Sequence, residues 1–342
     1  NLPKRALTGA TIGVAESYMD GDWTSPDITT FLRLFVVNEE WGNKLANKSK
    51  FTRAITKIQH WFNRNTKTKA KKNISAHYDL GNDFYELWLD ETMTYSSALY
   101  DGANISLEAA QDAKYARISE ELDLAPGKSV LEIGCGWGGF AEYAAKQRGA
   151  NVTCLTISPS QRDWALERMQ REGLGEKVDI RLQDYRDHVG KYDGVASIEM
   201  FEAVGESYWP SYFAKVEECL NPAAKAALQI ITIQDSLFPR YRKRADFIQR
   251  YIFPGGMLPS KEMMEELGNQ AGLSQISTRA FGLDYAQTLE EWRHRFWAAW
   301  DTIKPLGFDD RFKRMWEFYF HYCEAGFKAD SVNVRQIVYQ KA

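Results

Sequence analysis

A glycine-rich loop is the first feature of the sequence whose residue types and spacing could support chemistry. Residues 130–139 read VLEIGCGWGG, an apolar run that leads into glycines at alternate positions, Gly134, Gly136 and Gly138. Glycines let the backbone turn tightly and approach a ligand, and the N-terminus of a following helix offers free N–H groups. The spacing fits both the loop that binds S-adenosylmethionine and the loop that binds a dinucleotide.

The residues around the loop decide between these two ligands. A dinucleotide fold needs Asp or Glu at the end of the second strand to bind the ribose, but residues 155–158 read LTIS. Glu132, just before the glycines, suits a ligand with an ammonium and a sulfonium group better than a pyrophosphate. A glycine turn without a ligand is disfavoured, because loop glycines cost conformational entropy. The loop therefore predicts an S-adenosylmethionine-dependent methyltransferase.

Strand and helix patterns alternate around this loop. The predicted strands are 129–134, 151–158, 178–183, 192–200, 226–233 and 334–339, and the predicted helices are 138–147, 160–172, 208–220, 261–271, 288–302 and 309–327. Such alternation builds a mostly parallel sheet with helices on both faces, an α/β fold of the Rossmann-like kind. Residues 240–260 interrupt the pattern and predict an insertion over the active site.

The N-terminal part of the chain differs in composition. All charged residues from 44 to 72 are Lys or Arg, and Phe51, Ile55, Ile58 and Phe62 recur there at helical spacing. This pattern indicates a basic amphipathic helix and a lysine-rich linker, which either contacts anionic lipid or packs on the catalytic domain. We expect a small, mainly helical accessory domain over 1–68 and the methyltransferase domain over 69–342.

The overall composition narrows the class of protein further. A net charge of −3 over 342 residues argues against a dedicated nucleic-acid binder. The four cysteines lack CxxC spacing, which indicates reduced thiols and no metal site. No apolar run approaches the ~18 residues that span a bilayer, so any membrane contact would be peripheral. We expect a cytoplasmic protein; whether a leader preceded Asn1 stays open.

Further segments resemble the cyclopropane-fatty-acyl-phospholipid synthase family, over nearly the whole chain. They are 16–21 (ESYMDG), 77–84 (HYDLGNDF), 94–96 (TYS), 156–161 (TISPSQ), 183–187 (QDYRD), 200–202 (MFE), 251–256 (YIFPGG) and 281–285 (FGLDY). The resemblance implies a seven-stranded class I methyltransferase sheet with a small N-terminal domain. It also implies the substrate, a cis double bond in an acyl chain of a membrane phospholipid.

The resemblance assigns cofactor contacts to this chain. Together with the loop and the second strand, the expected S-adenosylmethionine site comprises Tyr95, Ser96, Glu132, Gly134, Gly136, Gly138, Thr156, Gln161, Asp184 and Tyr185. Without the family pattern, Tyr95 and Tyr185 would be read as core residues and Gln161 as an ordinary helix N-terminal residue.

The expected catalytic positions depart from the family pattern. The resemblance implies a bicarbonate ion, held by Cys, Glu, His and Tyr, that removes a proton from the added methyl group and so closes the ring. Glu202 and Tyr285 match this set, whereas Ser97 stands in place of the Cys. Gln229, or Ile231 if the register shifts, stands in place of the His. Ser and Gln can still bind an anion through hydrogen bonds.

The departure leaves more than one product open. A cyclopropane fatty acid is the expected product if the site holds bicarbonate. If no base reaches the methyl group, a hydride shift and proton loss elsewhere give a methyl-branched or methylene fatty acid. Methylation of a small soluble substrate is a third interpretation, and it leaves the basic helix unexplained. The expected partner is an anionic phospholipid bilayer at the inner face of the cell membrane; a homodimer stays open.

Overall fold

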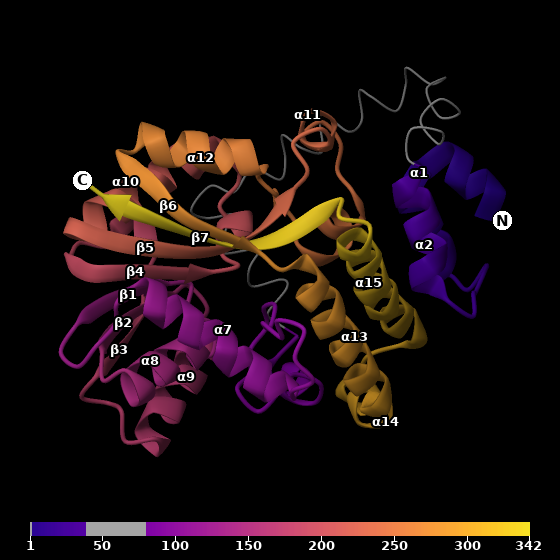
Figure 1. Ribbon diagram of the computed structural model, residues 1–342. Coiled ribbons are helices and arrows are strands. Elements are labelled where there is room, and N and C mark those ends of the chain that lie inside the picture. The colour runs from indigo at the N-terminus through magenta and orange to yellow at the C-terminus, as the bar shows by residue number, and fades with distance from the viewer. Residues whose placement is uncertain (1, 39–79) are drawn as a thin grey trace.

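A seven-stranded sheet forms the centre of the protein (Figure 1). The computed structural model describes residues 2–38 and 80–342, so the predicted basic segment at 44–72, the domain boundary near Thr68 and motif residues 77–79 lie outside the described residues. The strands in spatial order are β3 (Val178–Leu182), β2 (Asn151–Thr156), β1 (Ser129–Ile133), β4 (Tyr192–Ile198), β5 (Leu220–Ile233), β7 (Val332–Lys341) and β6 (Leu273–Ala280).

The strand directions are those of a mostly parallel sheet. Strands β1 to β5 pair in parallel, and β7 runs antiparallel to both β5 and β6. The predicted α/β fold is therefore confirmed, because parallel strands with helical crossovers are its defining feature. The carboxyl ends of the parallel strands meet at one edge of the sheet, where ligands bind in such folds.

Helices cover both faces of the sheet. On one face lie α7 (Leu107–Glu121), α8 (Gly139–Gln147) and α9 (Pro159–Arg171), and on the other lie α10 (Trp209–Cys219) and α12 (Lys261–Gln270) (Figure 1). Local sequence sets the start of α9, since the Ser158 side chain accepts a hydrogen bond from the Gln161 N–H and Pro159 occupies the first turn. This turn places Gln161 directly after the second strand.

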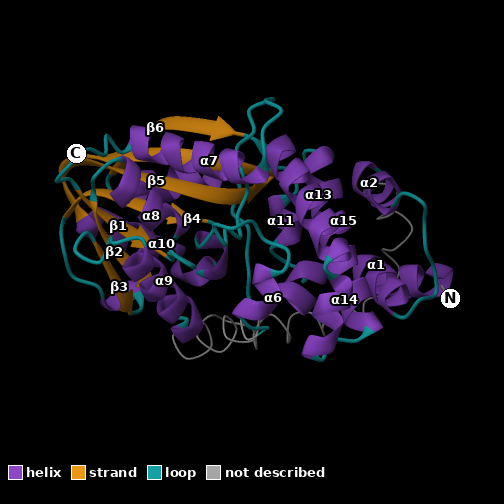
Figure 2. Ribbon diagram, turned by 90° about the horizontal axis from the view of Figure 1, so that it is seen from below, coloured by secondary structure: helices purple, strands orange, loops and turns teal. Residues whose placement is uncertain are grey.

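A helical layer stands beyond the carboxyl edge of the sheet. It contains α13 (Gly282–Ala298), α14 (Trp300–Ile303) and α15 (Asp310–Lys328), with α6 (Asn82–Glu86) beside them (Figure 2). Its interior is aromatic: Trp88, Trp292, Trp316, Phe84 and Phe320 are all buried in one cluster. Many of the aromatic residues of the chain therefore form the hydrophobic core of this helical layer, next to the sheet.

Two N-terminal helices, α1 (Leu2–Met19) and α2 (Ile28–Val37), lie against α15 on the outside of this layer (Figure 2). Their attachment is partly polar, because the Tyr18 hydroxyl donates to Glu317 over 2.6 Å and the Tyr251 hydroxyl donates to Glu16 over 2.6 Å. The second contact links α1 to the predicted insertion at 240–260, which begins within the short helix α11 (Phe238–Tyr241) and contains the π-helical segment Ile248–Ile252. None of the described helices is long and apolar enough to cross a membrane.

Candidate active site

The glycine loop lies between β1 and α8 and has the backbone that its glycines predict. Gly134, Gly136 and Gly138 all have positive φ, at 85°, 53° and 82°. A Cβ on Gly134 would lie 2.5 Å from Met200 Cγ, whereas a Cβ on Gly136 would meet nothing within 4 Å. The loop is therefore packed against the end of β4 on one side and open at Gly136.

Glu132 lies beneath the loop on the face of the sheet that α7 covers. Only 2% of it is exposed, and its Oε2 accepts a hydrogen bond from the Cys154 thiol over 3.6 Å. Burial raises the pKa of Glu132 to about 7. Glu132 is thus buried below the loop and bonded to the second strand through Cys154. Its contact with the cofactor stays a prediction.

The ends of β2 and β3 carry the other predicted cofactor residues. The Thr156 hydroxyl donates to Gln161 Oε1 over 3.1 Å, which fixes the side chain that follows the second strand. Asp184 accepts from Arg186 at both carboxylate oxygens, over 2.8 and 2.5 Å, and the Tyr185 ring packs on Tyr212. These residues surround the carboxyl ends of β2 and β3, next to the loop.

Tyr95 and Ser96 enter the site from the segment between α6 and α7. The Tyr95 hydroxyl donates to Tyr319 over 3.0 Å, and its ring centroid lies 5.2 Å from that of Trp292. Ser96 is buried, and its hydroxyl oxygen accepts a hydrogen bond from Lys114 over 2.6 Å. The pair therefore joins the aromatic layer to α7.

The predicted catalytic residues converge on a carboxylate that the sequence reasoning did not single out, Glu199. Glu199 Oε1 accepts from the Ser97 main-chain N–H and from Gln229 Nε2, each over 2.8 Å. Its Oε2 accepts from the Tyr285 hydroxyl over 2.6 Å. Three of the four predicted catalytic residues thus bind one side chain.

The backbone at Glu199 explains how its side chain reaches this place. Its φ of 50° lies in the left-handed region, which a glutamate rarely adopts and which often marks functional sites. Burial raises the pKa of Glu199, while the bonds from Tyr285 and Gln229 oppose that rise. The signal in the sequence was an acid at the end of the fourth predicted strand, three residues before Glu202.

Glu202 faces the same region from the short 3-10 turn Phe201–Ala203. Its Oε1 accepts from the Ile231 N–H over 2.6 Å, and its Oε2 is buried without a hydrogen-bond partner. Burial, and then the charge of Glu199, raise the pKa of Glu202 to about 8. Glu202 therefore lies near Glu199 but does not bond Ser97, Gln229 or Tyr285, and its raised pKa favours the protonated carboxyl at neutral pH.

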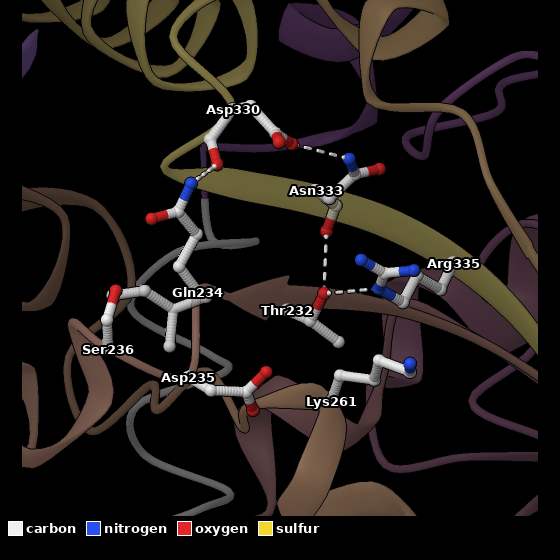
Figure 3. A pocket seen from close by; sticks show the side chains of 9 residues that line it. Thr232, Gln234, Asp235, Ser236, Lys261, Asp330, Asn333 and Arg335 are labelled. Carbon is white, nitrogen blue, oxygen red and sulfur yellow. Dashed lines mark hydrogen bonds between the residues drawn. The ribbon is translucent and has the colours of Figure 1, made fainter.

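A separate cavity of ≈ 280 Å³ lies at the end of β5, lined by residues 232–236, Lys261, Asp330, Asn333 and Arg335 (Figure 3). None of the predicted site residues lines it. Arg335 donates to Thr232 over 3.1 Å. Its neighbour Gln336 bonds Gln229, and successive strand residues point to opposite faces. The cavity therefore lies across the sheet from Glu199.

Comparison with known proteins identifies the family. Residues 65–337 match the model of the family described as mycolic acid cyclopropane synthetase. The chain is 39% identical to the tuberculostearic acid methyltransferase UfaA1 of Mycobacterium tuberculosis, over 98% of this chain and 80% of that protein. It is 38% identical to the cyclopropane-fatty-acyl-phospholipid synthase of Escherichia coli strain K12, over 99% of this chain and 85% of that protein.

A solved structure gives the same result. The mycolic acid cyclopropane synthase CmaA1 complexed with SAH and CTAB superposes with a TM-score of 0.74 at 29% identity, covering 79% of this chain and 98% of that chain. The glycine loop, the missing acid after the second strand and these similarities agree on the cofactor. The chain therefore belongs to the mycolic acid cyclopropane synthetase family and is an S-adenosylmethionine-dependent methyltransferase.

Proposed function

We propose that this protein transfers the methyl group of S-adenosylmethionine to the cis double bond of an unsaturated acyl chain in a membrane phospholipid. We further propose that the Glu199 carboxylate removes a proton from the resulting cation. One observation carries the second proposal: Glu199 accepts hydrogen bonds from three positions that the family resemblance assigns to an anion, Ser97, Gln229 and Tyr285. The similarity to the cyclopropane-fatty-acyl-phospholipid synthase of Escherichia coli supports the phospholipid substrate.

The described residues do not fit a bicarbonate ion beside Glu199. The Ser97 N–H and the Tyr285 hydroxyl donate to Glu199, and the amide N–H groups of Gln229 are divided between Glu199 and the Ser97 carbonyl, the latter over 3.2 Å. These donors are therefore engaged. A second anion would also be repelled by the Glu199 carboxylate. A carboxylate from the chain thus takes the place of the ion.

The surroundings of Glu199 suit a reaction that passes through a carbocation. When bound, S-adenosylmethionine supplies an electrophilic methyl group, whose transfer to the alkene leaves a positive charge on the acyl chain. The rings of Tyr95, Tyr285 and Trp292 lie together, at centroid distances of 5.2 and 6.0 Å from Trp292. Aromatic faces stabilise a cation by roughly 0.5–2 kcal/mol each and exclude the water that would trap it. Glu199 Oε2 accepts one protein hydrogen bond, so a lone pair remains for the proton.

We propose a product without a ring. Bicarbonate held by the same donors would present a third oxygen to the substrate, whereas both oxygens of Glu199 are already bound by protein groups. These bonds make Glu199 a weaker and slower base than a free anion, so a hydride shift from the methylated carbon comes before proton loss. Proton loss from the tertiary cation to Glu199 gives a methylene or methyl-substituted alkene, with no further reactant. The ring is the second candidate, since relatives carry both kinds of name.

Product analysis tests this assignment. We expect the purified protein, incubated with vesicles of unsaturated phospholipid and labelled S-adenosylmethionine, to yield an acyl chain with a methylene group or a methyl-substituted double bond, at a rate that bicarbonate depletion leaves unchanged. Mass spectrometry after ozonolysis distinguishes these products from a cyclopropane, which resists ozone. A cyclopropane whose formation stops without bicarbonate would reinstate the ion and overturn the role of Glu199. Equal activity without any lipid would point to a small soluble substrate instead.

We also propose that the protein binds the bilayer peripherally, from the cytoplasmic side. Leu34, Phe35 and Val37 on α2 are 58%, 47% and 66% exposed, an apolar group at the end of the helix. Residues 44–72, whose charged side chains are all Lys or Arg, follow α2 closely in the sequence. Apolar insertion combined with attraction to anionic head groups is the usual basis of such binding.

Replacing Leu34 and Phe35 together by serine should weaken binding to anionic vesicles by about tenfold or more, because two apolar side chains leave the membrane. Vesicle sedimentation measures the change, and cofactor affinity should stay the same. Leu306→Ser is the matched control, since Leu306 is also exposed, at 45%, but lies after α14. If both variants sediment like the parent, α2 is not the membrane contact.

A further inference from the structure

Lys114 is a fully buried lysine next to the candidate active site. It lies on α7, none of its surface is exposed, and its Nζ donates to the Ser96 hydroxyl oxygen over 2.6 Å. Buried lysines normally form an ion pair. In the described part of the chain no carboxylate oxygen lies within 4.0 Å of its nitrogen. Its charge is thus held without a direct counter-ion.

Lys114 and its helix neighbour Gln111 together fix Ser96. Gln111 Nε2 donates to the Ser96 carbonyl over 3.0 Å, and residues three apart share one helix face. Because Lys114 donates to the Ser96 hydroxyl oxygen, the hydrogen of that hydroxyl is free to point away from α7. Any ligand that touches Ser96 therefore lies close to the Lys114 nitrogen.

The groups that face Lys114 come from four elements. They are Ser96 and Asp90 from the segment before α7, Glu132 from β1, Glu199 after β4, and Tyr115 on α7 itself, whose ring centroid lies 4.6 Å from the nitrogen. Burial lowers the pKa of the Lys114 ammonium to about 7, while the carboxylates of Glu199, Asp90 and Glu132 oppose this change. The amine therefore titrates near neutral pH, where a new charge nearby shifts the balance between its two forms.

We propose that Lys114 exchanges a proton in response to the charge of the cofactor, releasing it when the sulfonium of S-adenosylmethionine binds and regaining it once the neutral S-adenosylhomocysteine remains. The proposal rests on the proposed placement of the cofactor against Ser96. A unit charge at ~10 Å, with an effective dielectric constant of ~20, shifts a pKa by roughly one unit. Such a shift is enough to favour the neutral form of an amine that titrates near neutral pH.

This exchange balances the charge of the reaction within the site. Before methyl transfer the site holds the sulfonium, a neutral Lys114 and the Glu199 carboxylate. Afterwards it holds a thioether, the Lys114 ammonium and the same carboxylate, so the one proton lost by the acyl chain is matched by the one proton gained at Lys114. The positive charge of the site therefore passes from sulfur to nitrogen, and the net charge stays the same. Lys114 is thus a positioning residue for Ser96 that also gains a proton.

Calorimetry of cofactor binding tests the proposal without any lipid substrate. Titrations near pH 7 in two buffers of different ionisation enthalpy give the number of protons exchanged on binding. We expect the parent protein to release about half a proton more with S-adenosylmethionine than with S-adenosylhomocysteine. The dissociation constant of S-adenosylmethionine, divided by that of S-adenosylhomocysteine, should fall as the pH rises through about 7, because the neutral amine favours the sulfonium.

Variants at Lys114 assign this proton. Lys114→Met, which has similar length and no charge, should make the two cofactors release equal numbers of protons, and Lys146→Met, at an exposed lysine on α8, should match the parent. Equal proton release by both cofactors in the parent overturns the proposal, and this comparison needs no variant to fold. A proton difference that survives in Lys114→Met overturns it as well. A wrong lipid assignment would change the product analysis and leave these titrations untouched.

Discussion

Replacing Glu199 by glutamine should lower the turnover of methyl transfer by about 10²–10⁴-fold, the usual cost of losing a general base. The amide has nearly the same shape, and its oxygen can still accept from the Ser97 N–H and from Gln229, so the site should keep its geometry. The glutamine amide cannot accept a proton at any relevant pH. Turnover is measured with labelled S-adenosylmethionine and phospholipid vesicles, and calorimetry with S-adenosylhomocysteine should show unchanged affinity.

Glu202→Gln is the matched control for this variant. At neutral pH the Glu202 carboxyl already holds a proton, because burial and the neighbouring Glu199 raise its pKa to about 8. Glutamine keeps the oxygen that accepts the Ile231 N–H, so turnover at pH 7 should change less than tenfold. Above pH 8 the parent should lose activity as Glu202 ionises beside Glu199, and the variant should not. A 100-fold loss in Glu202→Gln with near-normal turnover in Glu199→Gln would return the base to Glu202.

The contrast between these two acids shows how far the sequence could locate the site. Both follow the fourth strand, and a resemblance to the family pattern favours Glu202, whose motif neighbours match. Which acid meets Ser97 and Tyr285 depends on the left-handed backbone at Glu199 and on the 3-10 turn that starts at Phe201. Neither conformation has a signature in residue type, since a positive φ is normally the property of glycine. The cofactor loop was accessible from sequence because glycine spacing does carry such a signature.

The fold shows the same limit at the edge of the sheet. Most strands with apolar runs were predicted within about two residues of their observed bounds, but β5 begins at Leu220, six residues before the predicted start at 226, and strand β6 was missed. Its partly buried face carries Gln275, Ser277 and Arg279, and Ile276 on the other face is 47% exposed. An edge strand with polar residues on both faces gives no apolar alternation to detect. Helix α13 begins at Gly282, six residues before the predicted start at 288. Its first turn contains Tyr285, whose side chain is buried.

Gly136→Leu should abolish measurable binding of S-adenosylhomocysteine, a loss of at least about 100-fold, while the protein stays folded. A Cβ at Gly136 meets no atom within 4 Å, so the side chain would project into the open side of the loop, where the cofactor must approach. The positive φ of 53° adds strain of about 1–2 kcal/mol, which a domain of this size can tolerate. Calorimetry measures binding, and thermal unfolding followed by circular dichroism measures the fold.

Gly134→Ala separates the cofactor effect from the packing effect. Here even a methyl group would lie 2.5 Å from Met200 Cγ, so overpacking of about 1–3 kcal/mol adds to the strain of a φ of 85°. We therefore expect a clear drop in unfolding temperature in Gly134→Ala and a much smaller drop in Gly136→Leu. Because Met200 lies between Glu199 and Phe201, movement of its side chain should also disturb the base. Gly136→Leu with parental affinity would mean that the cofactor does not pass over the open side of the loop.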